Sequence, residues 1–186
     1  RERYGTLGQV QFYLETKGQN FEAYLEGQCC FEEALAAVQG AIPADRRRVR
    51  VDRGDLDRFV FNADDVAVVV GQDGLVPNAA KYLRGQLVLG INPDPARFVG
   101  VLCPHPPAAF AALLEWVGTR AGAYRVERRV MAEARREDGQ SLLALNEIYL
   151  GCRTHQSSKY LLRAGGREER QSSSGVLVGT GTGSTG

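Results

Sequence analysis

A short apolar run, residues 66–70, constrains the fold of this chain more than any other feature of its sequence. Such a run of mostly valine residues is typical of a strand that is buried on both faces of a parallel sheet. It ends at a glycine turn, residues 71–74, and the pattern then predicts a helix over residues 75–83 and a second apolar strand over residues 86–91. Strand, turn, helix and strand in this order predict a parallel βαβ unit and therefore an α/β fold class.

Helical spacing of apolar residues predicts further helices on both sides of this unit. The spacing is clear over residues 31–38 and again over residues 110–117. Upstream, one or two more helices are predicted, with an interruption at Gly18. The proline-rich residues 93–107 are predicted as a loop. Together these elements define a predicted α/β domain with a parallel sheet over residues 1–120.

The character of the sequence changes at the start of the predicted second domain, residues 121–186, where apolar and charged residues mix. Short strands are predicted at residues 124–130, 142–150, 160–163 and 176–178, so this domain is expected to be β-rich. Its last residues, 179–186, contain only glycine, threonine and serine. They predict a functional loop and a β-rich domain that is incomplete at the C-terminus, although composition alone also allows a flexible tail.

Composition is that of a globular protein. Hydrophobic residues make up 44% and charged residues 24% of the chain, and no apolar run approaches the length of a membrane span. The formal net charge of +1 supplies no general field for nucleic acid or an anionic membrane, so neither is predicted as a partner. Four cysteines without CxxC spacing argue against a structural zinc site and fit a reducing compartment. The predicted location is cytoplasmic, or mitochondrial if a leader has been removed before Arg1.

The turn at residues 71–74 places a carboxylate, Asp73, at the carboxyl end of the predicted buried strand. Open α/β sheets bind their ligands at this end of their strands. Glycines at such a turn allow phosphate oxygens to approach backbone N–H groups, and a following helix N-terminus favours negative charge. Taken alone, the same four residues are also compatible with an ordinary turn.

Three segments, in order, resemble motifs of the NAD kinase family. Residues 71–75 (GQDGL) resemble the GGDGT motif of NAD kinases and their lipid-kinase relatives, and residues 144–148 (ALNEI) resemble the asparagine-glutamate motif that separates NAD kinases from those relatives. Residues 174–185 resemble the family's glycine/threonine loop. The sequence of residues 90–97 is most similar to the mitochondrial-type branch of the family. The resemblance covers the chain from about Phe31 onward.

The resemblance implies an ATP-dependent enzyme that phosphorylates the adenosine ribose 2'-hydroxyl of NAD. Asp73 would be the catalytic residue, orienting or deprotonating that hydroxyl. The implied phosphate donor is ATP with Mg²⁺, or polyphosphate, with no metal ligand assigned to the protein, and a homo-oligomer is expected. The residues implied in NAD binding are Asp73, Gly74, Asn146, Glu147, Ser174, Thr182, Ser184 and Thr185. Those implied in a phosphate or ATP loop are Gly71, Gln72, Gly74, Gly181 and Gly183.

Two departures from the family motif keep alternatives open. Gln72 stands where the family has a second glycine, which adds a side chain beside the phosphate path. Leu75 stands where the family has threonine, so a hydroxyl that could cap the helix or contact phosphate is missing. A catalytically weak or inactive NAD-binding module of the same fold is therefore the main alternative, and a related lipid or small-molecule kinase is the next.

Overall fold

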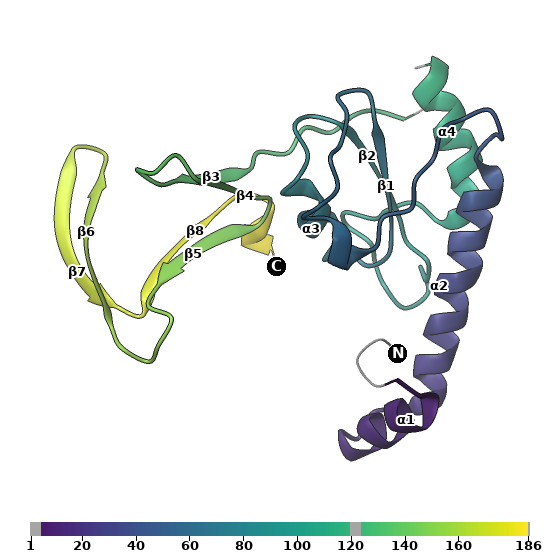
Figure 1. Cartoon of the computed structure of the whole chain (residues 1–186), viewed down its shortest axis with the longest axis horizontal. Coiled ribbons are helices and arrows are strands. Elements are labelled where there is room, and N and C mark those ends of the chain that lie inside the picture. The colour runs from purple at the N-terminus through teal and green to yellow at the C-terminus, as the bar shows by residue number, and fades with distance from the viewer. Residues whose placement is uncertain (1–4, 120–123, 186) are drawn as a thin grey trace. The chain divides into compact units, whose positions relative to one another are not determined.

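The chain forms a mixed α/β structure with one parallel two-stranded sheet and several antiparallel strands (Figure 1). A computed structural model describes residues 5–119 and 124–185. The chain divides into two compact units, each described by itself below. The first comprises residues 1–51, 64–76 and 86–124, and the second comprises residues 52–63, 77–85 and 125–186. The predicted parallel sheet and the predicted β-rich segment are both present.

Two consecutive helices open the first unit, α1 (Leu7–Thr16) and α2 (Phe21–Ala41). Each begins at a polar residue whose side-chain oxygen accepts backbone N–H bonds: Thr6 for α1 and Asn20 for α2. The predicted interruption at Gly18 is confirmed. The helix predicted over residues 31–38 is also confirmed, but it starts earlier, since α2 runs unbroken from Phe21.

The sheet of the first unit consists of β1 (Val66–Val70) and β2 (Leu87–Ile91), paired in parallel from Val66 opposite Leu87 to Val70 opposite Ile91. This confirms the predicted parallel pair. The connection contains α3 (Leu75–Ala80). A helix was predicted over residues 75–83, so the observed helix begins where expected but ends earlier. The loop after β2 leads through a short 3₁₀ turn, Pro107–Ala109, to α4 (Phe110–Thr119), close to its predicted bounds.

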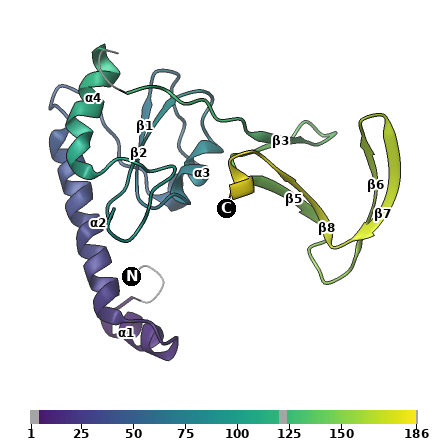
Figure 2. The ribbon, with the colours of Figure 1, turned by 180° about the vertical axis from the view of Figure 1, so that it is seen from behind.

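The hydrophobic core of the first unit lies where α2 and α4 pack against this sheet, an arrangement that Figure 2 shows from the opposite side to Figure 1. Phe110 and Ile91 have no exposed surface at all. Burial of such side chains is the main favourable term in folding. The buried members of this core are Ala34, Val38, Val70, Leu89, Ile91, Phe110 and Leu113.

The second unit is built from antiparallel two-stranded pairs. The first pair is a hairpin of β3 and β4, while β5 pairs with β8 and encloses the hairpin of β6 and β7 in the sequence. The result is a β-ribbon that continues past the β5–β8 pair into the β6–β7 pair. The strands are β3 (Ala132–Arg135), β4 (Ser141–Ala144), β5 (Glu147–Gly151), β6 (Ser158–Ala164), β7 (Arg167–Ser173) and β8 (Gly175–Gly179).

Two strand predictions for this unit need correction. Residues 124–130 form no strand, and Tyr124 belongs to the first unit, where it packs edge-on against Trp116 and His105 with ring centroids 6.3 and 5.7 Å apart. The segment predicted as one strand over residues 142–150 is two strands, since the chain turns between β4 and β5.

Within the described part of the chain, no helix is both long and apolar enough to cross a membrane.

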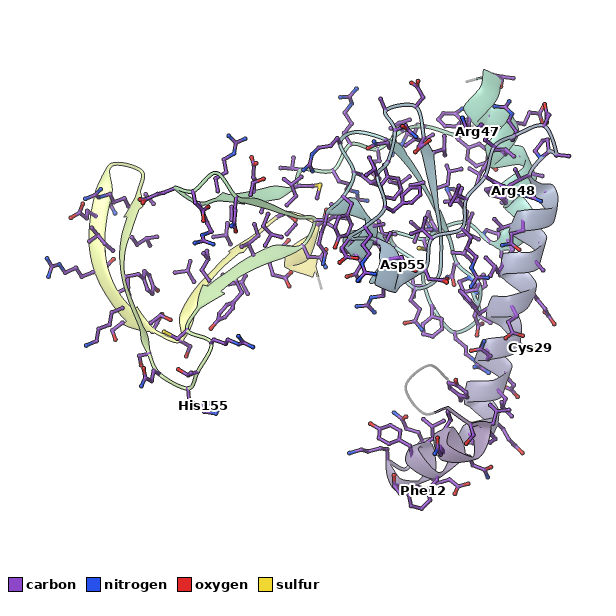
Figure 3. The ribbon with its side chains drawn as sticks, in the orientation of Figure 1. Phe12, Cys29, Arg47, Arg48, Asp55 and His155 are labelled. Carbon is purple, nitrogen blue, oxygen red and sulfur yellow. The ribbon has the colours of Figure 1, made fainter. Side chains whose placement is uncertain are left out.

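Removal of the Phe110 ring should test the position of the core. Phe110→Ala is expected to lower the free energy of unfolding by about 3–5 kcal/mol, because it leaves a cavity among fully buried side chains. The matched control is Phe12→Ala on α1, labelled in Figure 3, where the ring is 71% exposed and the loss should stay within about 0.5 kcal/mol. Urea unfolding measures both. Equal losses in the two variants would contradict this assignment of the core.

Candidate functional site

Asp73 lies in the turn that directly follows β1, at the carboxyl end of the parallel sheet. The backbone N–H of Gly71 donates to the carbonyl of Ile91 at 3.0 Å, so the turn begins where the pairing of β1 with β2 ends. The N–H of Leu75 then donates to the carbonyl of Gln72 at 2.9 Å, which closes the turn. The sequence therefore placed this carboxylate correctly at the edge where α/β sheets bind ligands.

The Asp73 carboxylate accepts three hydrogen bonds from consecutive backbone N–H groups of the loop that follows β2. Its Oδ2 accepts from the N–H of Val101 at 2.7 Å. Its Oδ1 accepts from the N–H groups of Leu102 and Cys103, both at 2.8 Å. Hydrogen bonds from an N–H to an ionised acceptor are about twice as strong as neutral ones. Asp73 therefore anchors this loop to the turn after β1.

These bonds decide the protonation state of Asp73. Partial burial acts to raise the pKa of the carboxyl, but the three N–H donors from Cys103, Val101 and Leu102 act in the opposite direction and prevail, so the pKa is lowered. A carboxylate offers about four acceptor positions. Three are in use, which leaves one on Oδ2. The group is thus a persistent anion that can accept one further hydrogen bond.

The residues beside Asp73 have different roles. Gln72 and Gly74 are exposed, so both can meet a ligand from solvent. Leu75 is half-buried, and its Cδ2 lies 3.1 Å from the point where a Cβ on Gly71 would stand. Leu75 therefore packs against the backbone of the turn, a contact that threonine could not make. The helix that follows has six residues, less than two turns, so the anion preference expected of a helix N-terminus is weaker here than predicted.

In the second unit, the structure brings together the segments that carry Asn146 and the glycine/threonine loop. The backbone N–H of Thr180 donates to the carbonyl of Asn146 at 2.8 Å, and the Thr180 hydroxyl donates to the carbonyl of Leu145 at 2.5 Å. That hydroxyl also accepts from the N–H of Gly183 at 3.1 Å. Thr180 thus holds the loop against the backbone of Leu145 and Asn146. The sequence did not predict this role.

The rest of the loop folds back on Thr180. The N–H of Ser184 donates to the carbonyl of Thr180 at 3.1 Å, and its hydroxyl donates to the carbonyl of Gly181 at 2.9 Å. Thr182 is half-buried, and Thr185 closes a short 3₁₀ turn that begins at Gly183. The predicted loop residues 181–185 therefore form one compact cluster beside the backbone of Asn146.

Two further predicted NAD-binding residues lie at opposite ends of the β5–β8 pair. Glu147 is exposed at the start of β5, opposite Gly179 and therefore next to the cluster. Ser174 lies just beyond the other end of the β5–β8 pair, where its carbonyl accepts from the hydroxyl of Tyr149 at 2.6 Å. At about 3.3 Å per residue, a strand of this length puts Ser174 about 20 Å from Thr180. The structure does not bring Ser174 to the loop.

Comparison with known proteins leaves the chain without a match: no protein-family model, no curated protein and no solved structure matches it. Within residues 5–119 and 124–185, no group of three or more His, Cys, Asp or Glu side chains could hold a metal ion.

The pH dependence of stability should report the bonds to Asp73. Because the folded-state pKa lies below the unfolded value of about 3.9, the stabilisation is present above about pH 4 and is lost as the pH falls through the folded-state pKa. Asp73→Asn, which leaves at least one N–H without an acceptor, should cost about 1–2 kcal/mol above pH 4 and progressively less below it. Urea unfolding over a pH series measures this. A constant difference at all pH values, or the same profile for exposed Asp57→Asn, would contradict the assignment.

A glycine pair in the loop of the second unit supplies a second test. A Cβ on Gly183 would stand 2.3 Å from the carbonyl oxygen of Asn146, whereas a Cβ on Gly181 would meet nothing within 4 Å. Gly183→Ala should therefore displace the loop and raise the amide exchange rate of Thr180, whose N–H is bonded to Asn146, by about tenfold or more. Gly181→Ala should leave this rate nearly unchanged. Equal rates in the two variants would mean that the loop does not rest on Asn146.

Proposed function

We propose that this chain is a nucleotide-binding phosphotransferase with an alcohol acceptor. More particularly, we propose an NAD kinase, which transfers the γ-phosphoryl group of ATP to the adenosine ribose 2'-hydroxyl of NAD. The single observation that carries the proposal is the Asp73 carboxylate, which stands at the carboxyl end of β1 with one acceptor position left on Oδ2. The choice of NAD as the substrate rests on the resemblance of the three motifs, in order, to those of NAD kinases.

Asp73 would act mainly by orienting the attacking hydroxyl. The 2'-hydroxyl would donate its hydrogen bond to Oδ2, its oxygen would form the new bond to the γ-phosphorus, and the bond to the bridging oxygen would break with its electron pair leaving on ADP. The hydroxyl proton would pass to Asp73 as the new bond forms. Phosphoryl transfer depends more on positioning and electrostatics than on a strong base. A carboxylate of lowered pKa is adequate for this task.

The cluster of the second unit would contribute the recognition of NAD. Asn146 and Glu147 would bond ribose hydroxyls, and the backbone N–H groups and hydroxyls of residues 182–185 would contact phosphate or adenine. A hydroxyl-bonding site loses about 1–3 kcal/mol when its polar groups are left unmatched, which would select a dinucleotide over a smaller substrate. Mg²⁺ would enter with ATP, held mostly by the phosphates and by water.

The main alternative is an NAD-binding module of the same ancestry with little or no turnover. Two observations favour it. The three N–H bonds lower the basicity of Asp73, and Leu75 fills with a packed apolar side chain the position where the family has a hydroxyl. A lipid or other small-molecule kinase is disfavoured by the resemblance of residues 144–148 to the asparagine-glutamate motif. We further propose a homo-oligomer located in the cytoplasm or the mitochondrion.

The test of the proposed function is NADP formation from NAD, ATP and Mg²⁺ by the purified protein. Wild type should form NADP, and Asp73→Asn should lower kcat by a factor of about 10²–10⁴ while NAD affinity changes by less than about tenfold. A coupled assay measures the first quantity and calorimetry the second. NAD binding without NADP formation would favour the binding module. Unchanged turnover in Asp73→Asn would remove Asp73 from the catalytic role.

A further inference from the structure

The loop that follows β2 carries the three N–H groups to Asp73, and Asn92 stands at its start. Asn92 is only 3% exposed, and both ends of its side-chain amide are in use. Its Nδ2 donates to the carbonyl of Phe98 at 2.8 Å, and its Oδ1 accepts from the N–H of Asp94 at 3.0 Å. The backbone N–H of Asn92 donates to the carbonyl of His105 at 2.8 Å. This one residue therefore bonds the start, the middle and the end of the loop.

The local sequence explains why an asparagine occupies this place. An asparagine followed by proline favours a turn, and its side chain can accept from the N–H two residues on, as it does here from Asp94. The amide then needs a second partner because a buried N–H₂ group without an acceptor is costly. The carbonyl of Phe98 supplies that partner. This bond closes the first part of the loop across six residues.

Asn92 and the segment bonded to Asp73 meet at Gly100. This glycine has φ +71°, a conformation that other residues rarely adopt. A Cβ there would stand 2.8 Å from Nδ2 of Asn92 and 2.3 Å from the carbonyl oxygen of Cys103. The Asn92 amide thus packs directly against Gly100, which precedes the three residues that donate to Asp73. A displacement at Asn92 would be transmitted to that backbone.

A second tether of the loop is weaker. Arg97 donates from Nη1 to the carbonyl of Ala23 at 2.8 Å and forms ion pairs with Glu26 and Asp94. The side chains of Arg97 and Glu26 are 38% and 66% exposed, so the ion pair that ties the loop to α2 is a surface pair, whereas the pair with the buried Asp94 lies within the loop. Exposed ion pairs contribute about 0–1 kcal/mol, whereas a buried amide that loses its partners costs about 1–3 kcal/mol for each. Asn92, and not Arg97, is therefore expected to set the position of the loop.

We propose that Asn92 is a positioning residue for Asp73, acting through the loop of residues 93–103 whose last three N–H groups orient the carboxylate. This inference rests on the proposed function for its effect on turnover. Its effect on the carboxylate itself does not depend on that function. Loss of the Asn92 amide releases the loop, the N–H groups move away from Asp73, and the carboxyl becomes easier to protonate and less well oriented.

Two other titratable side chains belong to the same loop. Burial, and then the charge of Asp73, raise the pKa of the Cys103 thiol to about 12, so this group stays neutral across the useful pH range. Burial lowers the pKa of His105, which stands at the end of the loop. Because His105 could contribute to the pH dependence of activity, the carboxyl of Asp73 must be observed directly.

The experiment follows the carboxyl carbon of Asp73 by carbon-13 NMR during a pH titration of the full chain, with the signal assigned by its loss in Asp73→Asn. Asn92→Ala should raise the pKa of Asp73 by about half a unit or more, since it loosens donors that favour the charged form. The same variant should lower kcat for NADP formation by about tenfold or more, with a smaller change in KM for NAD. Thr6→Ala, which removes the cap of α1, should change neither quantity.

Gly100→Ala keeps the Asn92 side chain but crowds both its amide and the carbonyl of Cys103, so it should raise the pKa of Asp73 as well. It also serves if Asn92→Ala does not fold. A folded Asn92→Ala or Gly100→Ala protein in which Asp73 titrates as in wild type would overturn the proposal, even if turnover falls, because the residue would then be only structural. If wild type forms no NADP but the titration shifts as expected, the proposed function fails and the positioning of Asp73 by Asn92 stands.

Discussion

Three hydrogen bonds from consecutive backbone N–H groups to one carboxylate join segments of the chain that are 28–30 residues apart. The rest of the first unit depends on this contact. It fixes the turn after β1 to the loop after β2, and it keeps Asp73 ionised at the edge of the sheet. The hydrophobic core of α2, α4 and the sheet holds the two strands, but it does not fix the loops that follow them. The bonds to the Asp73 carboxylate join these loops to each other.

In the second unit, the glycine/threonine loop is held by hydrogen bonds between neutral groups. Leu145 and Ile148 are buried around the turn between β4 and β5, while large side chains farther along the ribbon, such as Tyr149 and Leu177, are 59% and 65% exposed. Packing alone therefore does not define the glycine/threonine loop. One hydroxyl does so, because Thr180 bonds the carbonyl of Leu145 and also accepts from Gly183. Both units thus hold glycine-containing loops through polar side chains: Asp73 and Asn92 in the first unit and Thr180 in the second.

The sequence predicted the elements that local patterns encode. The valine run gave β1, its parallel partner and the place of Asp73, since these follow from hydrophobicity and turn chemistry over a few residues. The strand β7 was not predicted because its residues, Arg167–Ser173, include no apolar side chain, so no alternation of apolar and polar residues marks it. The partners of Asp73 and the role of Asn92 were also missed. The bonds to Asp73 join a side chain to backbone groups 28–30 residues away, and those of Asn92 depend on the path of an irregular loop, so no periodic pattern in the sequence reports them.

The central claim is that Asp73, held by the loop after β2, presents one open acceptor position to a ribose hydroxyl. A crystal structure of the full chain with NAD bound tests it most directly. The account predicts the adenosine ribose 2'-hydroxyl within about 3 Å of Oδ2 of Asp73, with the bonds from Val101, Leu102 and Cys103 retained. A ribose bound elsewhere, or a loop that has left Asp73 in the complex, would contradict the account.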